Sequence, residues 1–185
     1  SKELALLGSA TGQIHWDLET YMPPKGVQLR SEQIALLSKI RHEMLVSPET
    51  GKLIDQAENI KELDETQKRN LYLARMVYDR ETKVPTDLVS KIAKHQAVSV
   101  DTWKKAKAAK DWKRFEPELE KMVELMRERH EYLLDVKGLS NIYDSMLDEF
   151  ERGMTQEDID KVFRELRDGL IPLVEKCAEA TSGFD

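Results

Sequence analysis

Apolar side chains recur at the spacing of an α-helix along most of this chain, and this pattern excludes most folds. The clearest stripe begins at Ile159 and recurs at offsets of 3, 4, 7, 11, 14, 15 and 18 residues, ending at Cys177. Those offsets place the side chains on one helical face. Two shorter stripes share this spacing: Leu36, Leu37, Ile40 and Met44, and then Leu119, Met122, Val123, Met126, His130 and Leu133. No segment alternates as a strand does, so we expect an all-α fold.

Prolines, glycines and capping residues divide the chain into about seven helices. Pro23-Pro24 should end the first helix, since proline cannot continue it. Ser47 and Asp64 are typical N-caps of later helices. A long helix is expected over about residues 111–138, and the last helix begins near Thr155. Connections between these elements are short, so neighbouring helices should pack mostly antiparallel.

Length and charge limit the classes of partner. The chain has 185 residues and a net charge of -6, which disfavours binding to nucleic acid or to an anionic membrane. Its single cysteine, Cys177, excludes an internal disulfide framework, and on an apolar stripe it should be inert packing. No apolar run is long enough to span a bilayer. We therefore predict a cytoplasmic protein with neither nucleic acid nor membrane as a partner.

Two fragments begin like the zinc motif H-E-x-x-H, which needs histidines at i and i+4 of one helix. His42-Glu43 and His130-Glu131 fail it, because Val46 and Leu134 stand at the second histidine position. We expect no metal site in this chain, with His42 on a charged helical surface and His130 in the core. Four carboxylates are expected to form a solvated helical face: Asp144, Asp148, Glu149 and Glu151.

The stretch from Trp103 to Arg114 combines cations with two tryptophans, as single-stranded nucleic acid sites do. The alternative is a solvated helix end whose cations suit the helix dipole, with Trp103 and Trp112 turned into the core. The acidic balance of the whole chain favours this second interpretation.

Near the start, the chain combines residue types that ordinary helix building does not require. These residues are Trp16, Asp17, Thr20, Met22, Pro23, Pro24 and Arg30. We expect Trp16 to anchor the core and Asp17 to pair with Arg30 across the proline corner. Thr20 should bond back to its own helix just before the helix ends. Such a stapled corner needs no substrate, so we predict a structural role for this motif.

The same motif carries a resemblance to a known family. Trp16-Asp17, Glu19-Thr20, Met22-Pro23-Pro24, Gly26 and Arg30 resemble a motif of the Taq-type zinc carboxypeptidases, which are H-E-x-x-H metallopeptidases. Further similar segments follow in the same order: Ser47-Pro48-Glu49, then residues 80–89, 115–123 and 143–155. Arg152 departs from the pattern, because proline is usual there.

The resemblance implies a helical fold with a deep groove above a catalytic zinc or cobalt ion. It also implies removal of C-terminal amino acids from peptide substrates, and a tendency to form homodimers. In that family the metal ligands come from H-E-x-x-H and a later glutamate. Neither that motif nor the family's His-Pro-Phe segment occurs in this sequence. The resemblance therefore covers the N-terminal third, and no catalytic or metal-binding residue carries over.

We therefore predict that residues 1–185 form a single helical domain, the N-terminal part of a larger helical metallopeptidase fold. It would supply groove wall and core to a metal-dependent carboxypeptidase, would be inactive alone, and would have the missing C-terminal catalytic region as its partner. The alternative is a stand-alone, non-catalytic helical interaction module derived from that family.

Overall fold

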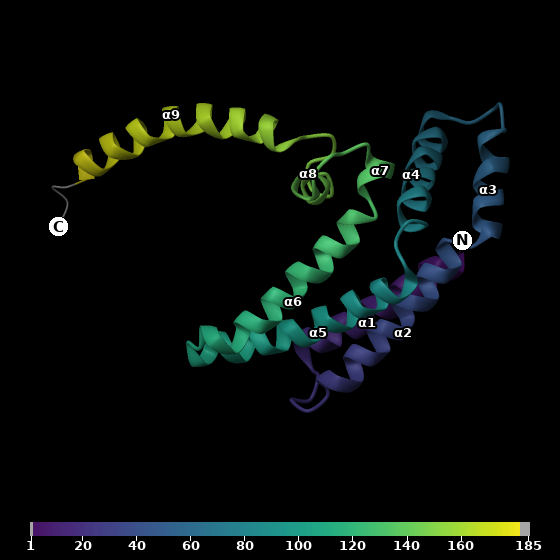
Figure 1. Ribbon diagram of the computed structural model, residues 1–185, viewed down its shortest axis with the longest axis horizontal. Helices are drawn as coiled ribbons and strands as arrows, with labels where there is room; N and C mark the ends of the chain where they lie inside the picture. The colour runs from purple at the N-terminus through teal and green to yellow at the C-terminus, as the bar shows by residue number, and fades with distance from the viewer. Residues whose placement is uncertain (1, 182–185) are drawn as a thin grey trace. The chain divides into compact units, whose positions relative to one another are not determined.

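The computed structural model describes residues 2–181, and within that range it contains α-helices and no strand (Figure 1). The helices are α1 (Lys2–Thr20), α2 (Val27–Leu45), α3 (Pro48–Glu58), α4 (Glu65–Glu81), α5 (Thr86–Ala109), α6 (Trp112–Glu131), α7 (Leu134–Lys137), α8 (Ile142–Leu147) and α9 (Gln156–Thr181). The all-α prediction is confirmed. The helix expected over residues 111–138 is divided, because the chain turns at Leu133, whose N–H donates to His130 O at 3.1 Å.

Most helix ends lie within one or two residues of their sequence signals. Ser47 Oγ accepts from Thr50 N at 3.2 Å, directly before Pro48 in the first turn of α3. Asp64 and Gln67 form a reciprocal capping box at the start of α4. Each of these caps satisfies backbone N–H groups that have no partner within the helix.

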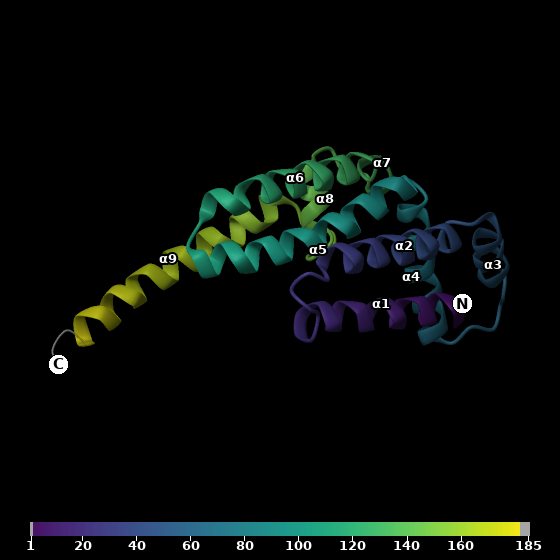
Figure 2. The same ribbon diagram turned by 90° about the horizontal axis from the view of Figure 1, so that it is seen from below.

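The described residues divide into two compact units, residues 2–137 and residues 138–181. In the first unit, α1, α2, α5 and α6 run side by side in that order, and each is antiparallel to its neighbour (Figure 2). The short helices α3 and α4 pack against each other, and α4 also contacts α2 and α7. The prediction of antiparallel packing is confirmed for α1, α2, α5 and α6. The expectation of one domain over residues 1–185 stays a prediction.

Two apolar clusters form the core of the first unit. One cluster consists of Val84, Leu88, Leu125 and Leu133, and the other of Leu18, Ile34 and Ala97. The second cluster joins the consecutive helices α1 and α2 to α5, which lies far from them in the sequence. Full burial of one aliphatic side chain contributes roughly 1.5–3 kcal/mol, so these few residues hold the long helices together.

Helix α2 buries only part of the stripe that the sequence predicts. Leu37 and Met44 are half-buried and Leu36 is 58% exposed, whereas Ile34 is 1% exposed and Ala35 is 8% exposed. Ser31 is fully buried, and its hydroxyl donates to Gln28 O at 2.8 Å, so it needs no partner from another helix. Small residues on this face let the neighbouring helices approach closely, and that face is therefore the one that packs.

In the second unit, the four carboxylates do not form one solvated face. Asp144 and Asp148 are each 8% exposed, so the prediction is wrong for them. Asp144 Oδ1 accepts from Gln156 N at 2.8 Å, and Asp148 Oδ1 accepts from Gly153 N at 3.0 Å. The loop between α8 and α9 has N–H groups that need acceptors, and these two carboxylates supply them.

Helix α9 carries the strongest apolar stripe of the sequence, yet its side chains from residue 160 to 180 are all exposed. Cys177 is among them, so the prediction that it is buried packing is wrong. A helical period shows that a face needs a partner, but it does not show which part of a protein supplies that partner. No helix between residues 2 and 181 is long and apolar enough to cross a membrane.

Candidate functional site

The motif predicted near the start forms the corner between α1 and α2. The N–H groups of Tyr21 and Met22 donate to Asp17 O at 3.0 and 2.8 Å, which closes the end of α1. Thr20 Oγ1 donates to Trp16 O at 2.6 Å, and this back-bond is the one that the sequence predicts. The chain then reverses at Pro23, whose carbonyl accepts from Gly26 N at 2.7 Å.

An ion pair spans this corner. Arg30 Nε donates to Asp17 Oδ2 at 2.6 Å, and Arg30 Nη1 donates to Gln33 Oε1 at 2.9 Å. The side chains of Asp17 and Arg30 are 27% and 28% exposed, so the pair is partly screened from solvent. The predicted ion pair between Asp17 and Arg30 is therefore confirmed. It lies at the edge of the core and is not fully buried.

Trp16 does not anchor the core as predicted. Its side chain is 56% exposed, and its ring lies 5.2 Å from that of Tyr21, which is 75% exposed. Leu18 is the residue of this turn that α1 buries. Two positions along a helix correspond to about 200° of rotation, so a helix that buries Leu18 turns Trp16 outward. Met22 packs against the core cluster, whereas Pro23 and Pro24 are exposed.

We predict that Asp17→Asn lowers the free energy of unfolding by about 1–2 kcal/mol, because it leaves Arg30 without its charged acceptor. Urea denaturation measures this change. Glu19→Gln is the matched control, since Glu19 pairs with Lys104 at an exposed position and should cost less than about 0.5 kcal/mol. Equal effects of the two changes would contradict a structural role for the Asp17–Arg30 pair.

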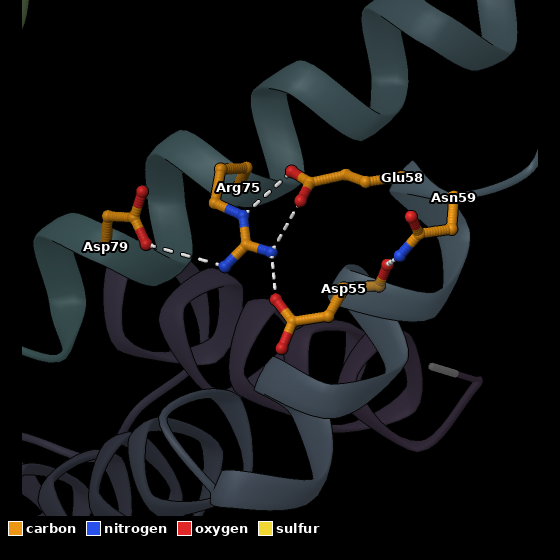
Figure 3. A network of polar contacts seen from close by, with 5 residues as sticks. All are labelled: Asp55, Glu58, Asn59, Arg75 and Asp79. Carbon is orange, nitrogen blue, oxygen red and sulfur yellow. Dashed lines mark hydrogen bonds and ion pairs between the residues drawn. The ribbon is translucent and has the colours of Figure 1, made fainter.

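A second polar cluster joins α3 to α4 through Arg75 (Figure 3). Arg75 Nε and Nη2 donate to the two carboxylate oxygens of Glu58, both at 2.8 Å. Nη2 also contacts Asp55, and Nη1 lies 3.8 Å from Asp79 Oδ1. Bidentate pairing of this kind fixes direction as well as distance. The cluster therefore acts as a clamp between two helices.

The Arg75 guanidinium lowers the pKa of Glu58 by hydrogen bonding. A carboxyl whose pKa falls on folding stabilises the protein above its ordinary pKa of about 4.3, and that contribution disappears as the pH falls through the lower, folded-state value. We therefore expect Arg75→Gln to destabilise the chain near pH 7, and the difference from the unchanged chain to shrink on acidification. Urea denaturation at several pH values measures it. Lys68→Gln, which removes an exposed pair with Glu65, should show no such trend.

The two histidines of the incomplete zinc motifs are both buried, in different places. His130 is fully buried near the end of α6, as expected. His42 is 4% exposed, so its predicted place on a charged surface is wrong. Its Nδ1 lies 2.9 Å from Thr86 Oγ1 and its Nε2 lies 3.0 Å from Glu81 O. His42 thus connects α2 with the α4–α5 junction, a role that only distant residues could reveal.

The two tryptophans of the basic stretch are not in the core. Trp103 is 43% exposed and Trp112 is 58% exposed, so the prediction that they turn inward is wrong. They flank the turn between α5 and α6, where the antiparallel helices end. Ala106, and not a tryptophan, is the buried residue here, because only a small side chain fits where the two helices meet.

Residues 1–183 match the family described as carboxypeptidase Taq (M32) metallopeptidase. The chain belongs to this family. Its M32 relatives include thermostable carboxypeptidase 1 of Pyrococcus furiosus, which is 32% identical over 178 residues. Another is carboxypeptidase 1 of Bacillus subtilis, which is 30% identical over 176 residues. Each alignment covers 94–95% of this chain but 34% of the relative. The chain therefore spans about a third of the length of these relatives.

Solved structures agree with the family assignment. The structure titled "BsuCP Crystal Structure" has a TM-score of 0.88 at 30% identity, covering 95% of this chain and 35% of that one. The Pyrococcus furiosus carboxypeptidase structure has a TM-score of 0.76 at 29% identity, covering 97% and 35%. A Trypanosoma cruzi metallocarboxypeptidase 1 also matches, with a TM-score of 0.76 at 26% identity, covering 98% and 36%.

M32 enzymes are metallopeptidases, but the residues that the structure describes do not fit a metal ion. Within residues 2–181, no three histidine, cysteine, aspartate or glutamate side chains gather as a metal site requires. Both ring nitrogens of His42 lie within hydrogen-bond distance of other groups, which leaves neither of them for a metal. No catalytic step can be derived from the described residues.

Proposed function

We propose that this chain is the N-terminal helical part of a metal-dependent carboxypeptidase that removes C-terminal amino acids from peptides. One observation carries the proposal: the M32 match extends over residues 1–183, while the chain covers about a third of its relatives. In this proposal the chain forms groove wall and core. A C-terminal catalytic region outside the 185 residues holds the zinc or cobalt ion.

The exposed face of α9 supports this role. Its large apolar side chains are between 47% and 60% exposed: Val162, Phe163, Leu166, Leu170, Ile171, Leu173 and Val174. A row of large exposed apolar side chains along one helix is typical of an interface rather than of a free protein surface. In our proposal this face packs against the catalytic region. A peptide as substrate, a homodimer as assembly and a cytoplasmic location belong to the same proposal.

Peptide hydrolysis at a metal needs ligands and a general base close together. The described residues 2–181 contain no such group of ligands. In our proposal the chain instead encloses the groove and keeps bulk water away, which strengthens electrostatic interactions with bound substrate. The Asp17–Arg30 corner and the Arg75 clamp serve this contribution by keeping the packed helices rigid.

We expect the purified chain to release no C-terminal amino acid from a blocked dipeptide, with zinc or cobalt added. Chromatography of the reaction mixture measures the release of the free amino acid. The Bacillus subtilis carboxypeptidase 1 relative serves as the positive control. Metal-dependent release by the 185-residue chain that stops on chelation would contradict its non-catalytic role.

The gene sequence downstream of the Asp185 codon tests the proposal that this chain is part of a longer carboxypeptidase. An H-E-x-x-H motif within about the next hundred codons, the length of a few further helices, supports the carboxypeptidase proposal. A stop codon in the native gene before any such motif would overturn it, and would favour the stand-alone interaction module instead.

A further inference from the structure

A cavity of about 310 Å³ lies at the turn between α5 and α6, inside the first unit. Trp103, Trp112 and Phe115 supply its aromatic walls, and the buried Ala106 lies between them. The rings of Trp112 and Phe115 meet edge to face, with centroids 6.0 Å apart. We refer to this cavity as the tryptophan pocket. Its volume suits one large apolar side chain.

The turn itself holds the tryptophan pocket open. Lys110 adopts a left-handed conformation, with φ of 53°, which lets the chain reverse after α5. Asp111 N then donates to Ala106 O at 2.9 Å, and Asp111 Oδ1 accepts from Arg114 N at 3.3 Å to begin α6. Because these bonds define the backbone from which the walls project, little ordering of the backbone is needed on binding.

The charges at the rim of the tryptophan pocket are mostly positive. Lys107 Nζ lies 4.8 Å from the centroid of the Trp103 ring, and Lys110 also lines the cavity. In the part of the chain that the structure describes, neither ammonium group has a carboxylate at ion-pair distance. Asp111 is the one acidic residue of the lining. This rim is therefore cationic on a protein whose net charge is -6.

We propose that the tryptophan pocket binds an acidic peptide segment of a partner protein, one that presents an aromatic side chain next to carboxylates. The aromatic side chain fills the space between Trp103 and Trp112, where edge and face contacts between rings are favourable. The neighbouring carboxylates pair with Lys107 and Lys110, and charge complementarity at such a rim directs association. The proposal depends on this pocket alone and not on the proposed peptidase role.

The same surface favours a peptide over a nucleic acid. Two cations of the basic stretch, Lys104 and Lys105, are already paired with Glu19 and Asp101. A polynucleotide needs a continuous track of cations for successive phosphates. Of the other cations in the stretch, Lys107 and Lys110 line the pocket, whereas Lys113 and Arg114 do not. One apolar space with two ammonium groups in its lining matches a single aromatic residue flanked by carboxylates.

Nuclear magnetic resonance of the 185-residue chain tests this proposal, because its three tryptophans give three indole N–H signals. The probe is Ac-Glu-Phe-Glu-NH2. It should shift the signals of Trp103 and Trp112 with saturation in the millimolar range or below, and leave Trp16 as an internal reference. The Lys107→Glu and Lys110→Glu double variant should weaken binding about tenfold or more, because both rim contacts become repulsive. Lys91→Glu, on an exposed part of α5 outside the pocket, should leave binding unchanged.

Matched probes separate the contributions. Ac-Glu-Ala-Glu-NH2, which lacks the ring, and Ac-Lys-Phe-Lys-NH2, which reverses the charges, should both bind at least about tenfold more weakly. No shift of Trp103 and Trp112 at millimolar Ac-Glu-Phe-Glu-NH2 would overturn the proposal. So would equal binding of the lysine peptide, or tighter binding of oligothymidylate, which would assign the surface to nucleic acid.

Discussion

Ile34→Ala is expected to lower the free energy of unfolding by about 2–5 kcal/mol, the largest single effect that we predict. Ile34 is 1% exposed and lies in the cluster with Leu18 and Ala97, where three helices meet. Removing its branched side chain loses apolar burial and leaves a cavity, which rigid helices close only in part. Urea denaturation followed by circular dichroism measures the change.

Leu36→Ala is the matched control on the same helix. Leu36 belongs to the stripe that the sequence predicts to be buried, but its side chain is 58% exposed. Its truncation should change stability by less than about 0.5 kcal/mol. A larger loss for Leu36→Ala than for Ile34→Ala would show that α2 packs with the face predicted from the sequence, and would contradict the structure.

Gly51→Ala is expected to destabilise the chain by about 1–3 kcal/mol, although alanine normally favours a helix over glycine. A Cβ at Gly51 would lie 2.5 Å from Tyr78 Oη and 2.9 Å from Tyr78 Cζ. The Arg75 guanidinium lies 6.0 Å from the centroid of the Tyr78 ring and is held by carboxylates of α3, so a shift of the ring would disturb this contact. The substitution should therefore push α3 and α4 apart, which thermal unfolding measures.

Two further variants distinguish this clash from a general effect of glycine. Gly8 lies inside α1, and an added Cβ would have no atom within 4 Å apart from its chain neighbours and the backbone of its own helix, so Gly8→Ala should raise stability by about 0.5–1 kcal/mol. Tyr78→Phe combined with Gly51→Ala removes the atom at 2.5 Å and should recover part of the loss. If the double variant is no more stable than Gly51→Ala, the close approach of Tyr78 is not the cause.

Local signals at helix ends are predictable from the sequence, because each depends on residues within one turn. The caps at Ser47 and Asp64 and the back-bond of Thr20 all join atoms three or four residues apart. The Asp17–Arg30 pair is also predictable, since Pro23-Pro24 forces a corner that returns the chain on itself. These features depend on chain chemistry and little on the remainder of the fold.

Which side of a helix is buried was much less predictable. Periodicity selects an apolar stripe, yet α2 buries Ser31 and Ala35 instead of Leu36, since small residues allow close packing on both sides. His42 is buried because Thr86 and Glu81, more than 35 residues away, provide hydrogen-bond partners. No local pattern contains that information.

For this protein the sequence by itself determined the helical fold class, most of the helix ends and the M32 family, because period, caps and motif residues are readable without contacts. It also showed that the H-E-x-x-H motif is absent. Only the tertiary structure decided that Trp16, Trp103 and Trp112 face outward and that Asp144 is buried. The physical reason is that burial depends on what packs against a side chain, and those neighbours come from distant parts of the chain or, for the face of α9 in our proposal, from outside it.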